Sequence, residues 1–479
     1  MRINSHILAI IFCNLLFVVS CFAQDPCYPG ELITASYATG GSSGYKSNVI
    51  WLTWGAQSNS DQYGRTDQAL SNGASSFASL PLSDGKYLCM EATLENITGT
   101  TIRSYIPGNW SGDTMDDQYN IGGTGTNNQM VAGIATTNGT ATFTVRCKAF
   151  LEGHPIKLGG LVIADAESLN NSGESIHAVA DGEWVITSVV KNIGAGSYLV
   201  QKSNVASGQQ IDFLSGNDDN TGAISFLSFN ETAFESEVND YEVTFDVEFT
   251  GGGTTAIALG LVIPNIDTGD APESYGAPIH TLEALNFTTD NVPLNIPTDL
   301  NTSTYEPANV ERGSSDFIGT VVPDPDNGQA HSTDALGDDN LGFADEEDAW
   351  PEHLKEFSYT ATYMPGDVIT ATIPYVGDTD SHIYGWIDFN LNGVFEIEER
   401  AYAPAPASQS SVDLQWTVPI QRVPRSTYVR LRYSADQTAV QDPSLTSQGG
   451  EVEDHKIRIL GPAVTNPVFH SRSKQNIDY

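Results

Sequence analysis

The sequence predicts an all-β protein made of two antiparallel β-sandwich domains joined by an acidic linker. Its strand-like runs are short and alternate between apolar and polar residues, as in 241–249 and 428–433, and Gly, Asn, Ser, Thr and Asp interrupt them. Almost no stretch keeps a helical period over three turns. At 479 residues the chain exceeds what one hydrophobic core usually supports, so at least two domains are expected.

The chain begins with a segment typical of a secretory signal peptide. Arg2 precedes an apolar run at 7–19, and the small residue Ala23 follows. We expect cleavage after Ala23, which makes residues 1–23 the signal peptide; the alternative is a lipoprotein site that would leave Cys21 as a lipid anchor. No segment reaches the roughly 20 apolar residues of a membrane span. We therefore expect a secreted or cell-surface protein with no membrane insertion after signal removal.

Four further regions follow from composition. We place the first β-sandwich domain at 25–265, the linker at 266–350, the second β-sandwich domain at 351–461 and a disordered tail at 462–479. The linker is rich in Pro, Asn, Thr and Asp. Its carboxylates either stay solvated or gather around a cation, and the densest group is Asp334, Asp338, Asp339, Asp345, Glu346, Glu347 and Asp348.

The charge balance excludes two classes of partner. The sequence has 60 acidic and 21 basic residues, which gives a formal net charge of −39. Such a surface repels nucleic acid and anionic membranes, and cations are its more natural partner. Solubility of an exported protein explains most of this charge without any bound ion. The oligomeric state stays open.

Three cysteines remain if cleavage follows Ala23. Cys89 and Cys147 each lie in a strand-like run, so we expect a disulfide between them, with Cys27 left over. The alternative is three buried free thiols, since free cysteine behaves as a small apolar residue. No pair has the close spacing of a zinc site.

Residues 388–399 fit the calcium-loop pattern D-x-[DN]-x-[DN]-G-x5-E at every specified place. Side-chain oxygens, one carbonyl and one water-mediated contact would come from Asp388, Asn390, Asn392, Val394, Glu396 and Glu399. Ca²⁺ is therefore the expected cofactor. The strand-like flanks lack the helices of an EF-hand, however, and Asn392-Gly393 between apolar runs equally predicts an ordinary hairpin without metal.

No residue is assigned a catalytic role. The G-x-S-x-G pattern at 40–44 lacks the strand, sharp turn and helix of a hydrolase nucleophile. A glycosidase needs only two carboxylates, which Asp165, Glu167 or Asp246 could supply. Trp110 lies among Gly, Asn and Ser, so it is the expected ligand-contact residue.

Two motifs in the second domain resemble the GEVED domain of bacterial surface proteins. Residues 386–396 read WIDFNLNGVFE, and 450–455 read GEVEDH. Residues 267–276 resemble the segment that commonly precedes such domains. The chain departs from the pattern at His455, where the family has an aromatic Tyr.

The first domain resembles the lectin-like non-repetitive domain of CshA-type fibrillar adhesins. The similar residues are YATGG at 37–41, IWLTW at 50–54, GLVIADAES at 160–168 and GEW at 182–184. Both resemblances imply a lectin-like or jelly-roll-like sandwich at the cell surface with an adhesive role. We thus expect a non-enzymatic adhesin whose first module binds an extracellular glycan or protein and whose second is a calcium-compatible spacer. The alternatives are a carbohydrate-active enzyme and a purely structural stalk component.

Overall fold

The computed structural model describes residues 27–460, apart from short internal segments. Those segments are 83–85, 108–114, 123–128, 168, 170–172, 215–220, 283–284, 289–291, 312–314, 324, 327–330, 338–345, 359–364 and 420–424. The expected signal peptide and tail, together with Trp110, Asp338, Asp339 and Asp345, therefore lie outside the described residues.

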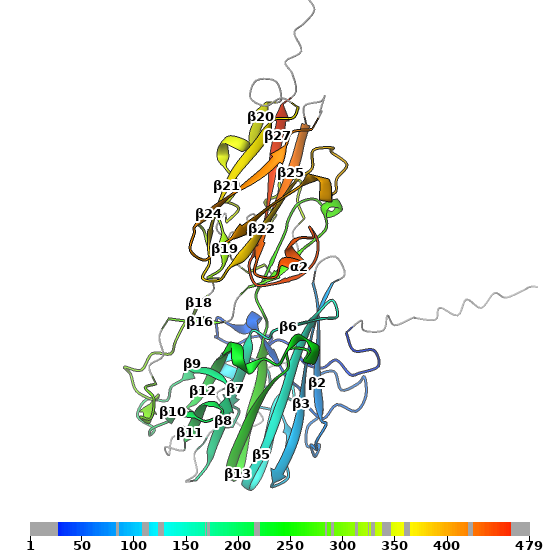
Figure 1. Ribbon diagram of the computed structural model, residues 1–479. Helices are drawn as coiled ribbons and strands as arrows, with labels where there is room; N and C mark the ends of the chain where they lie inside the picture. Colours follow the sequence, from blue (N-terminus) through cyan, green and yellow to red (C-terminus); the bar gives the residue numbers. More distant parts are fainter. Residues whose placement is uncertain are drawn as a thin grey trace, which may run out of the picture.

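Mostly antiparallel sheets form two bodies that follow one another along the chain, drawn blue to green and yellow to red in Figure 1. The all-β prediction is confirmed. Within the described ranges the helical elements are single turns: α1 (Met115–Gln118), α2 (Gln437–Val440), η1 (Lys46–Asn48), η3 (Glu231–Ala233), η4 (Glu237–Asn239), η5 (Glu273–Tyr275), η7 (Glu352–Leu354) and η8 (Ile397–Glu399). None of the described helices is long and apolar enough to cross a membrane.

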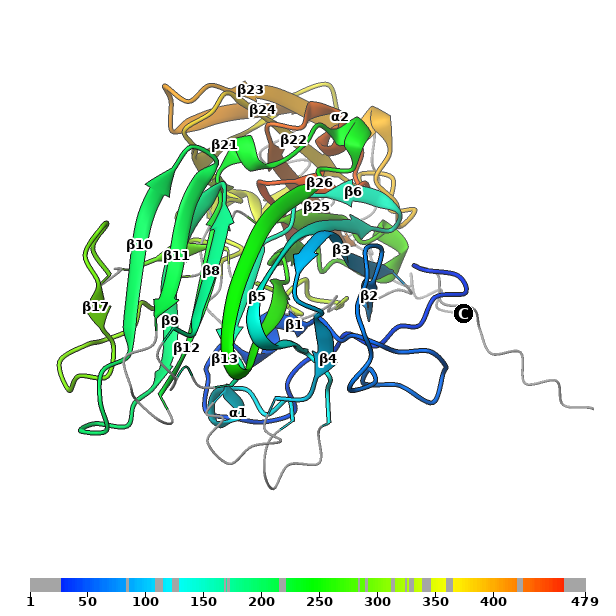
Figure 2. The ribbon, with the colours of Figure 1, turned by 90° about the horizontal axis from the view of Figure 1, so that it is seen from below.

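One layer of the first body is a curved sheet, and its strands lie side by side across Figure 2. Its strands run in the order β17 (Thr298–Asp299), β10 (Leu199–Val205), β11 (Gly208–Leu214), β8 (Ser175–Ala180), β13 (Val243–Val262), β5 (Gly133–Leu151), β3 (Tyr87–Gly99) and β2 (Ser75–Pro81). Period-2 alternation places the apolar side chains of β13 inside, whereas Thr244, Asp246 and Glu248 point outward. Inward Phe249 packs edge-on against Phe143, and burying such a ring stabilises the fold by about 1.5–3 kcal/mol.

The second layer shares its longest strands with the first. It contains β1 (Val49–Trp51), β4 (Arg103–Tyr105), β7 (Gly160–Asp165), β9 (Gly182–Val190) and β12 (Gly222–Phe229), while short β6 (His154–Ile156) pairs with the far end of β5. β13 pairs with β8 over 246–250 and with β7 over 257–262, and its pairing with β5 shifts register between Gly251 and Thr254. Glycines at 251–253 suit such an irregularity, because glycine weakens regular pairing and permits a bend. One strand thereby contributes to both layers of the sandwich.

The second body packs two smaller sheets against each other. One runs β20 (Glu356–Ser358), β27 (Glu451–Leu460), β25 (Arg425–Ser434), β22 (Ser381–Ile387) and β23 (Arg400–Ala405). The other runs β19 (Phe317–Ile318), β21 (Val368–Val376) and β24 (Ser411–Thr417). Between them lies a core that includes Ile373, Trp416 and Leu431.

The stretch expected to be an acidic linker supplies strands to both bodies. β14 (Ile266–Thr268) and β15 (Ile279–Thr281) pair with each other, and β15 pairs in parallel with β26 (Ser447–Gln448) of the second body. β17 instead pairs with β10, and Leu300 and Tyr305 belong to the first core. A small pair is formed by β16 (Asn286–Phe287) and β18 (Val310–Glu311), which lie on either side of β17 in the sequence.

The expected Cys89–Cys147 disulfide is wrong. Cys27 forms a disulfide with Cys89, with a Cα–Cα distance of 5.5 Å, and Cys147 is a buried free thiol. In the antiparallel pairing of β3 with β5, Cys147 lies opposite Ala92 on the core face, whereas Cys89 lies opposite Phe150 on the other face. Side chains on opposite faces of a sheet point apart and cannot be bridged.

Candidate functional sites

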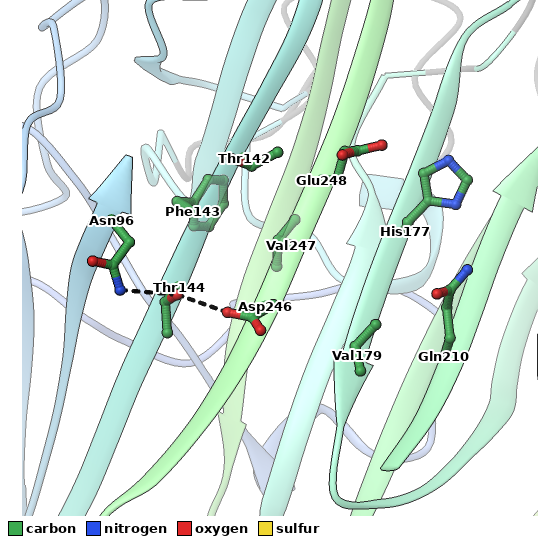
Figure 3. A pocket seen from close by; sticks show the side chains of 10 residues that line it. All are labelled: Asn96, Thr142, Phe143, Thr144, His177, Val179, Gln210, Asp246, Val247 and Glu248. Atoms are coloured by element: carbon green, nitrogen blue, oxygen red, sulfur yellow. Dashed lines mark hydrogen bonds between the residues drawn. The ribbon is translucent and has the colours of Figure 1, made fainter. Parts of the chain in front are cut away.

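A polar groove crosses the outward face of the first body's curved sheet (Figure 3). Its volume is about 490 Å³. Five adjacent strands, β3, β5, β13, β8 and β11, supply the lining: Asn96, Thr142, Phe143, Thr144, His177, Val179, Gln210, Asp246, Val247 and Glu248. The strands are far apart in sequence, so only the sheet order brings these side chains together.

Hydrogen bonds fix part of the groove floor. Asn96 Nδ2 donates to Thr144 Oγ1 at 3.3 Å, and that hydroxyl donates to Asp246 Oδ1 at 2.7 Å. His177 Nδ1 lies 2.6 Å from Asp212 Oδ1, which also accepts a hydrogen bond from Gln210 Nε2. The floor therefore combines carboxylate, amide, hydroxyl and imidazole groups, which suits a ligand rich in hydrogen-bonding groups.

Asp165 and Asp246, two of the three carboxylates suggested for a glycosidase, lie far apart. Asp165 ends β7 opposite Ile257, whereas Asp246 lies eleven residues earlier on β13. At about 3.3 Å per residue, that separation is roughly 35 Å along the strand, far beyond the roughly 5–9.5 Å of glycosidase pairs. Asp165 is buried and accepts a hydrogen bond from the Tyr198 hydroxyl at 2.8 Å.

The 388–399 loop connects β22 to β23 and is not a two-residue hairpin, because Trp386 pairs with Arg400. Asp388 is completely buried, and its carboxylate accepts hydrogen bonds from the backbone N–H groups of Leu391 at 2.6 Å and Gly393 at 3.0 Å. The Tyr275 hydroxyl donates to the same carboxylate at 2.7 Å. Asp388 thus organises the turn and anchors the preceding segment.

The other end of the loop folds back onto its start. Glu399 is buried and accepts hydrogen bonds from the backbone N–H groups of Phe389 at 2.9 Å and Asn390 at 3.1 Å. Burial raises the pKa of Glu399 to about 7, and the nearby Asp388 carboxylate raises it as well. Glu396 and Glu399 form a capping box around η8. Asn392 Oδ1 accepts from the Val394 N–H at 3.0 Å, while the Val394 side chain is exposed.

A second acidic group lies on β27. Glu451 and Glu453 are buried on one face of the strand, and the Glu453 carboxylate accepts hydrogen bonds from Ala349 N–H at 2.9 Å and His455 Nε2 at 2.8 Å. Burial, and then its acidic neighbour Glu453, raise the pKa of Glu451 well above its usual value. Glu347, Glu453 and His455 each place one potential metal-ligating atom within 4.8 Å of the others.

Residues 47–262 match the family described as surface adhesin CshA non-repetitive domain 2, and residues 382–458 match the GEVED domain family. The chain joins a CshA-type adhesin domain to a GEVED domain. No curated protein matches the chain. Among solved structures, the N-terminal domain of the Streptococcus gordonii adhesin Sgo0707 is 9% identical with a TM-score of 0.28, over 90% of this chain and 88% of that one. A score that low does not establish a shared fold.

The GEVED motif itself has two structural roles. Glu451 and Glu453 face the core between the sheets, whereas Asp454 on the opposite face pairs with Arg430 Nη2 at 2.6 Å. Asp454 also accepts the Ala271 N–H at 2.8 Å, and Arg430 donates to the Tyr275 carbonyl at 2.9 Å. The motif therefore fixes the segment before the GEVED domain to its central sheet.

Sequence reasoning missed the groove and the partners of Glu453. Alternation did show that Asp246 and Glu248 share one face of a strand, but not that His177 and Gln210 lie on the same sheet. Glu347 was noted only as part of an acidic stretch, and its approach to Glu453 depends on the fold. His455, the departure from the family pattern, is a hydrogen-bond donor to this group.

Proposed function

We propose that this chain is an exported, non-enzymatic cell-surface adhesin whose CshA-type domain binds an extracellular glycan or protein. The main observation that supports this proposal is the polar groove on the curved sheet. Its hydroxyl, amide and imidazole groups match the hydrogen-bonding capacity of sugar hydroxyls or of an extended polypeptide. The surface-adhesin family matched by residues 47–262 supports the same class of function.

The charge of the groove restricts the classes of ligand that it can bind. Asp246 and Glu248 project from adjacent outward positions of β13, and no Lys or Arg is among the described lining residues. Carboxylates repel anionic ligands and attract cationic or hydrogen-bond-donating ones. The groove therefore favours neutral or basic glycans, or basic polypeptide segments, over sulfated or sialylated ones.

This function can be tested by measuring how the mature chain binds to an array of neutral, basic and acidic glycans and to a panel of extracellular-matrix proteins. Asp246→Ala should weaken binding at least about tenfold, since hydrogen bonds to charged groups contribute about 1.5–3 kcal/mol. Thr244→Ala is the matched control, because Thr244 is an outward residue of β13 that does not line the groove. Equal binding by the two variants would refute the groove assignment, and turnover of a bound glycan would favour the enzyme alternative.

We also propose that the GEVED domain is a spacer whose 388–399 loop binds Ca²⁺. The support is the donor set: Asp388, Asn390, Asn392, Glu396 and Glu399 supply oxygens, and the Val394 carbonyl completes the pattern. The fold brings Asp388 and Glu399 close enough for their charges to interact.

Calcium should raise the melting temperature of the mature chain, because a ligand that binds only the native state stabilises it. Asp388→Asn should abolish the part of the rise that comes from the loop, whereas Glu398→Gln, at an exposed position of the same loop, should keep it. An unchanged rise in Asp388→Asn would show that the loop is held by its backbone hydrogen bonds alone.

A further inference from the structure

Carboxylates gather in the interior of the GEVED domain between β27 and the segments that cover it. Five of them are at most 8% exposed: Asp267, Glu346, Glu347, Glu451 and Glu453. Glu451 interacts electrostatically with Glu453, Asp267 and Glu346, and Glu453 with Asp348. Burying like charges together is costly unless a cation or bound protons offset them.

Neither buried arginine of the neighbouring strand forms an ion pair with these five carboxylates in the described part of the chain, although Arg432 interacts electrostatically with Asp267. Arg430 forms its ion pair with Asp454, on the other face of the sheet from Glu451 and Glu453. Arg432 donates to His280 and to the backbone carbonyls of Ala439 and Leu445. His455 is the basic side chain that contacts Glu453.

Two carboxylate oxygens in this cluster accept no hydrogen bond within the described part of the chain. They are Glu451 Oε1 and Glu453 Oε1, and both residues are at most 1% exposed. The second oxygen of each glutamate is fixed by backbone: Glu451 Oε2 accepts from Ile318 N–H at 2.6 Å, and Glu453 Oε2 accepts from Ala349 N–H at 2.9 Å. The remaining oxygens are therefore held in place without a hydrogen-bond donor among the described residues.

Gly319 marks the place where two of these carboxylates converge. A methyl group added to Gly319 would collide with Asp348 Oδ1 and lie 3.0 Å from Glu453 Oε1. The backbone there has a φ of +79°, which favours glycine. Glycine thus permits the close approach of Asp348 and Glu453 at the edge of the cluster.

We propose that this cluster binds a divalent cation, with Glu451, Glu453 and Glu347 as ligands and Ca²⁺ as the preferred ion. Carboxylate oxygens dominate the donors, and hard cations such as Ca²⁺ take 6–8 oxygen ligands. His455 holds Glu453 through its hydrogen bond. The ion would tie β19, the 346–349 stretch and β27 together, which fastens the acidic stretch to the domain core.

This site is separate from the 388–399 loop and does not depend on the proposed adhesive function. Asp388 donates its backbone N–H to Tyr428, whereas Glu451 pairs with Tyr433, five residues further along β25. That is about 17 Å along the strand. The two sites can therefore be removed one at a time.

The proposal is tested by calorimetric titration of the mature chain with Ca²⁺ and by thermal unfolding with and without the ion. Glu451→Gln should bind one Ca²⁺ fewer than the wild type, whereas Asp388→Asn should keep this site. Without calcium, Glu451→Gln should melt no lower than the wild type, because the substitution removes a repulsive buried charge. Glu356→Gln, at an exposed position of β20 in the same sheet, is the matched control and should bind as the wild type does.

The proposal would be overturned if Glu451→Gln bound as many Ca²⁺ ions as the wild type and kept the full calcium-induced rise in Tm. A rise produced by Zn²⁺ and not by Ca²⁺ would also overturn it, because that would mean that the imidazole of His455 selects the ion. A calcium-free Glu451→Gln protein that melts well below the wild type would also contradict it, since the glutamate would then be stabilised without a cation.

Discussion

At the scale of single residues, the ion pair of Arg430 with Asp454 is a buried pair of charges held by several hydrogen bonds. Arg430 donates Nε and Nη2 to the two oxygens of Asp454 at 2.7 and 2.6 Å. Its other hydrogen bonds go to backbone carbonyls, including those of Tyr275 and Pro443 at 2.9 Å. A planar guanidinium matches this arrangement, because it offers five donors in a fixed geometry.

Removing Arg430 should therefore be severe. Arg430→Leu leaves Asp454 buried without its counter-charge, and such a loss typically costs about 3–5 kcal/mol. The exposed pair of Arg458 with Glu356 is the comparison, and Arg458→Gln should cost at most about 1 kcal/mol. Urea unfolding of the three proteins measures both values, and similar losses would contradict the role given to Arg430.

His280 should make stability fall in acid. Its Nδ1 donates to the Gly449 carbonyl at 3.0 Å and its Nε2 accepts from Arg432 Nε at 3.0 Å, so the ring is neutral. Burial, and then the charge of Arg432, lower the pKa of His280 well below its usual value. Below about pH 6.5 only the unfolded chain takes up this proton, so stability is lost as pH falls, by up to about 1.4 kcal/mol per unit.

The measurement is the free energy of unfolding at pH 7.5 and pH 5.5 for the wild type and for His280→Gln. The wild type should lose more stability across this range than the variant. Parallel pH profiles would mean that His280 does not titrate differently in the folded and unfolded chains.

At the scale of elements, the two faces of one strand decide the covalent structure of the first body. β3 turns Leu88, Met90 and Ala92 toward the core and Cys89 away from it. The N-terminal segment that carries Cys27 covers that outward face and forms the disulfide. Cys147 instead packs in the core, where burial raises the pKa of its thiol and keeps it unreactive.

Cys27→Ala should destabilise the first body by about 4 kcal/mol in the chain-entropy model, since the disulfide spans 62 residues. Cys147→Ala is the matched control, because it removes a core thiol and no cross-link. Thiol titration of the unfolded, unreduced mature protein should find the Cys147 thiol alone. Three reactive thiols, or an unchanged melting temperature in Cys27→Ala, would contradict the Cys27–Cys89 pairing.

At the scale of the whole molecule, the acidic stretch at 266–350 belongs to both bodies. Its first part gives Ala271 and Tyr275 to the GEVED domain, where Tyr275 packs 4.7 Å from Phe395. A later part gives Leu300 and Tyr305 to the first core. The bodies also touch directly, with Gln448 Nε2 donating to the Pro155 carbonyl at 3.3 Å.

A fragment of residues 351–461 should therefore fail to fold on its own. It lacks the Tyr275 partner of Asp388, the Ala271 N–H on Asp454 and the His280 partner of Arg432. The fragment 265–461 restores all three and should show dispersed NMR signals and cooperative melting. A shorter fragment that melts like the full chain would contradict this account.

The sequence by itself determined the all-β class, the alternation that buries one face of β13, and the two family resemblances, because period-2 patterns and contiguous motifs are local. Only the tertiary structure decided three further features: the burial of Trp51 and Trp54, the Cys27–Cys89 disulfide, and the approach of Glu347 to Glu453. Each of these depends on which strands pair and in what register. Pairing between residues distant in sequence is set by the packing of the whole sandwich, which no local pattern contains.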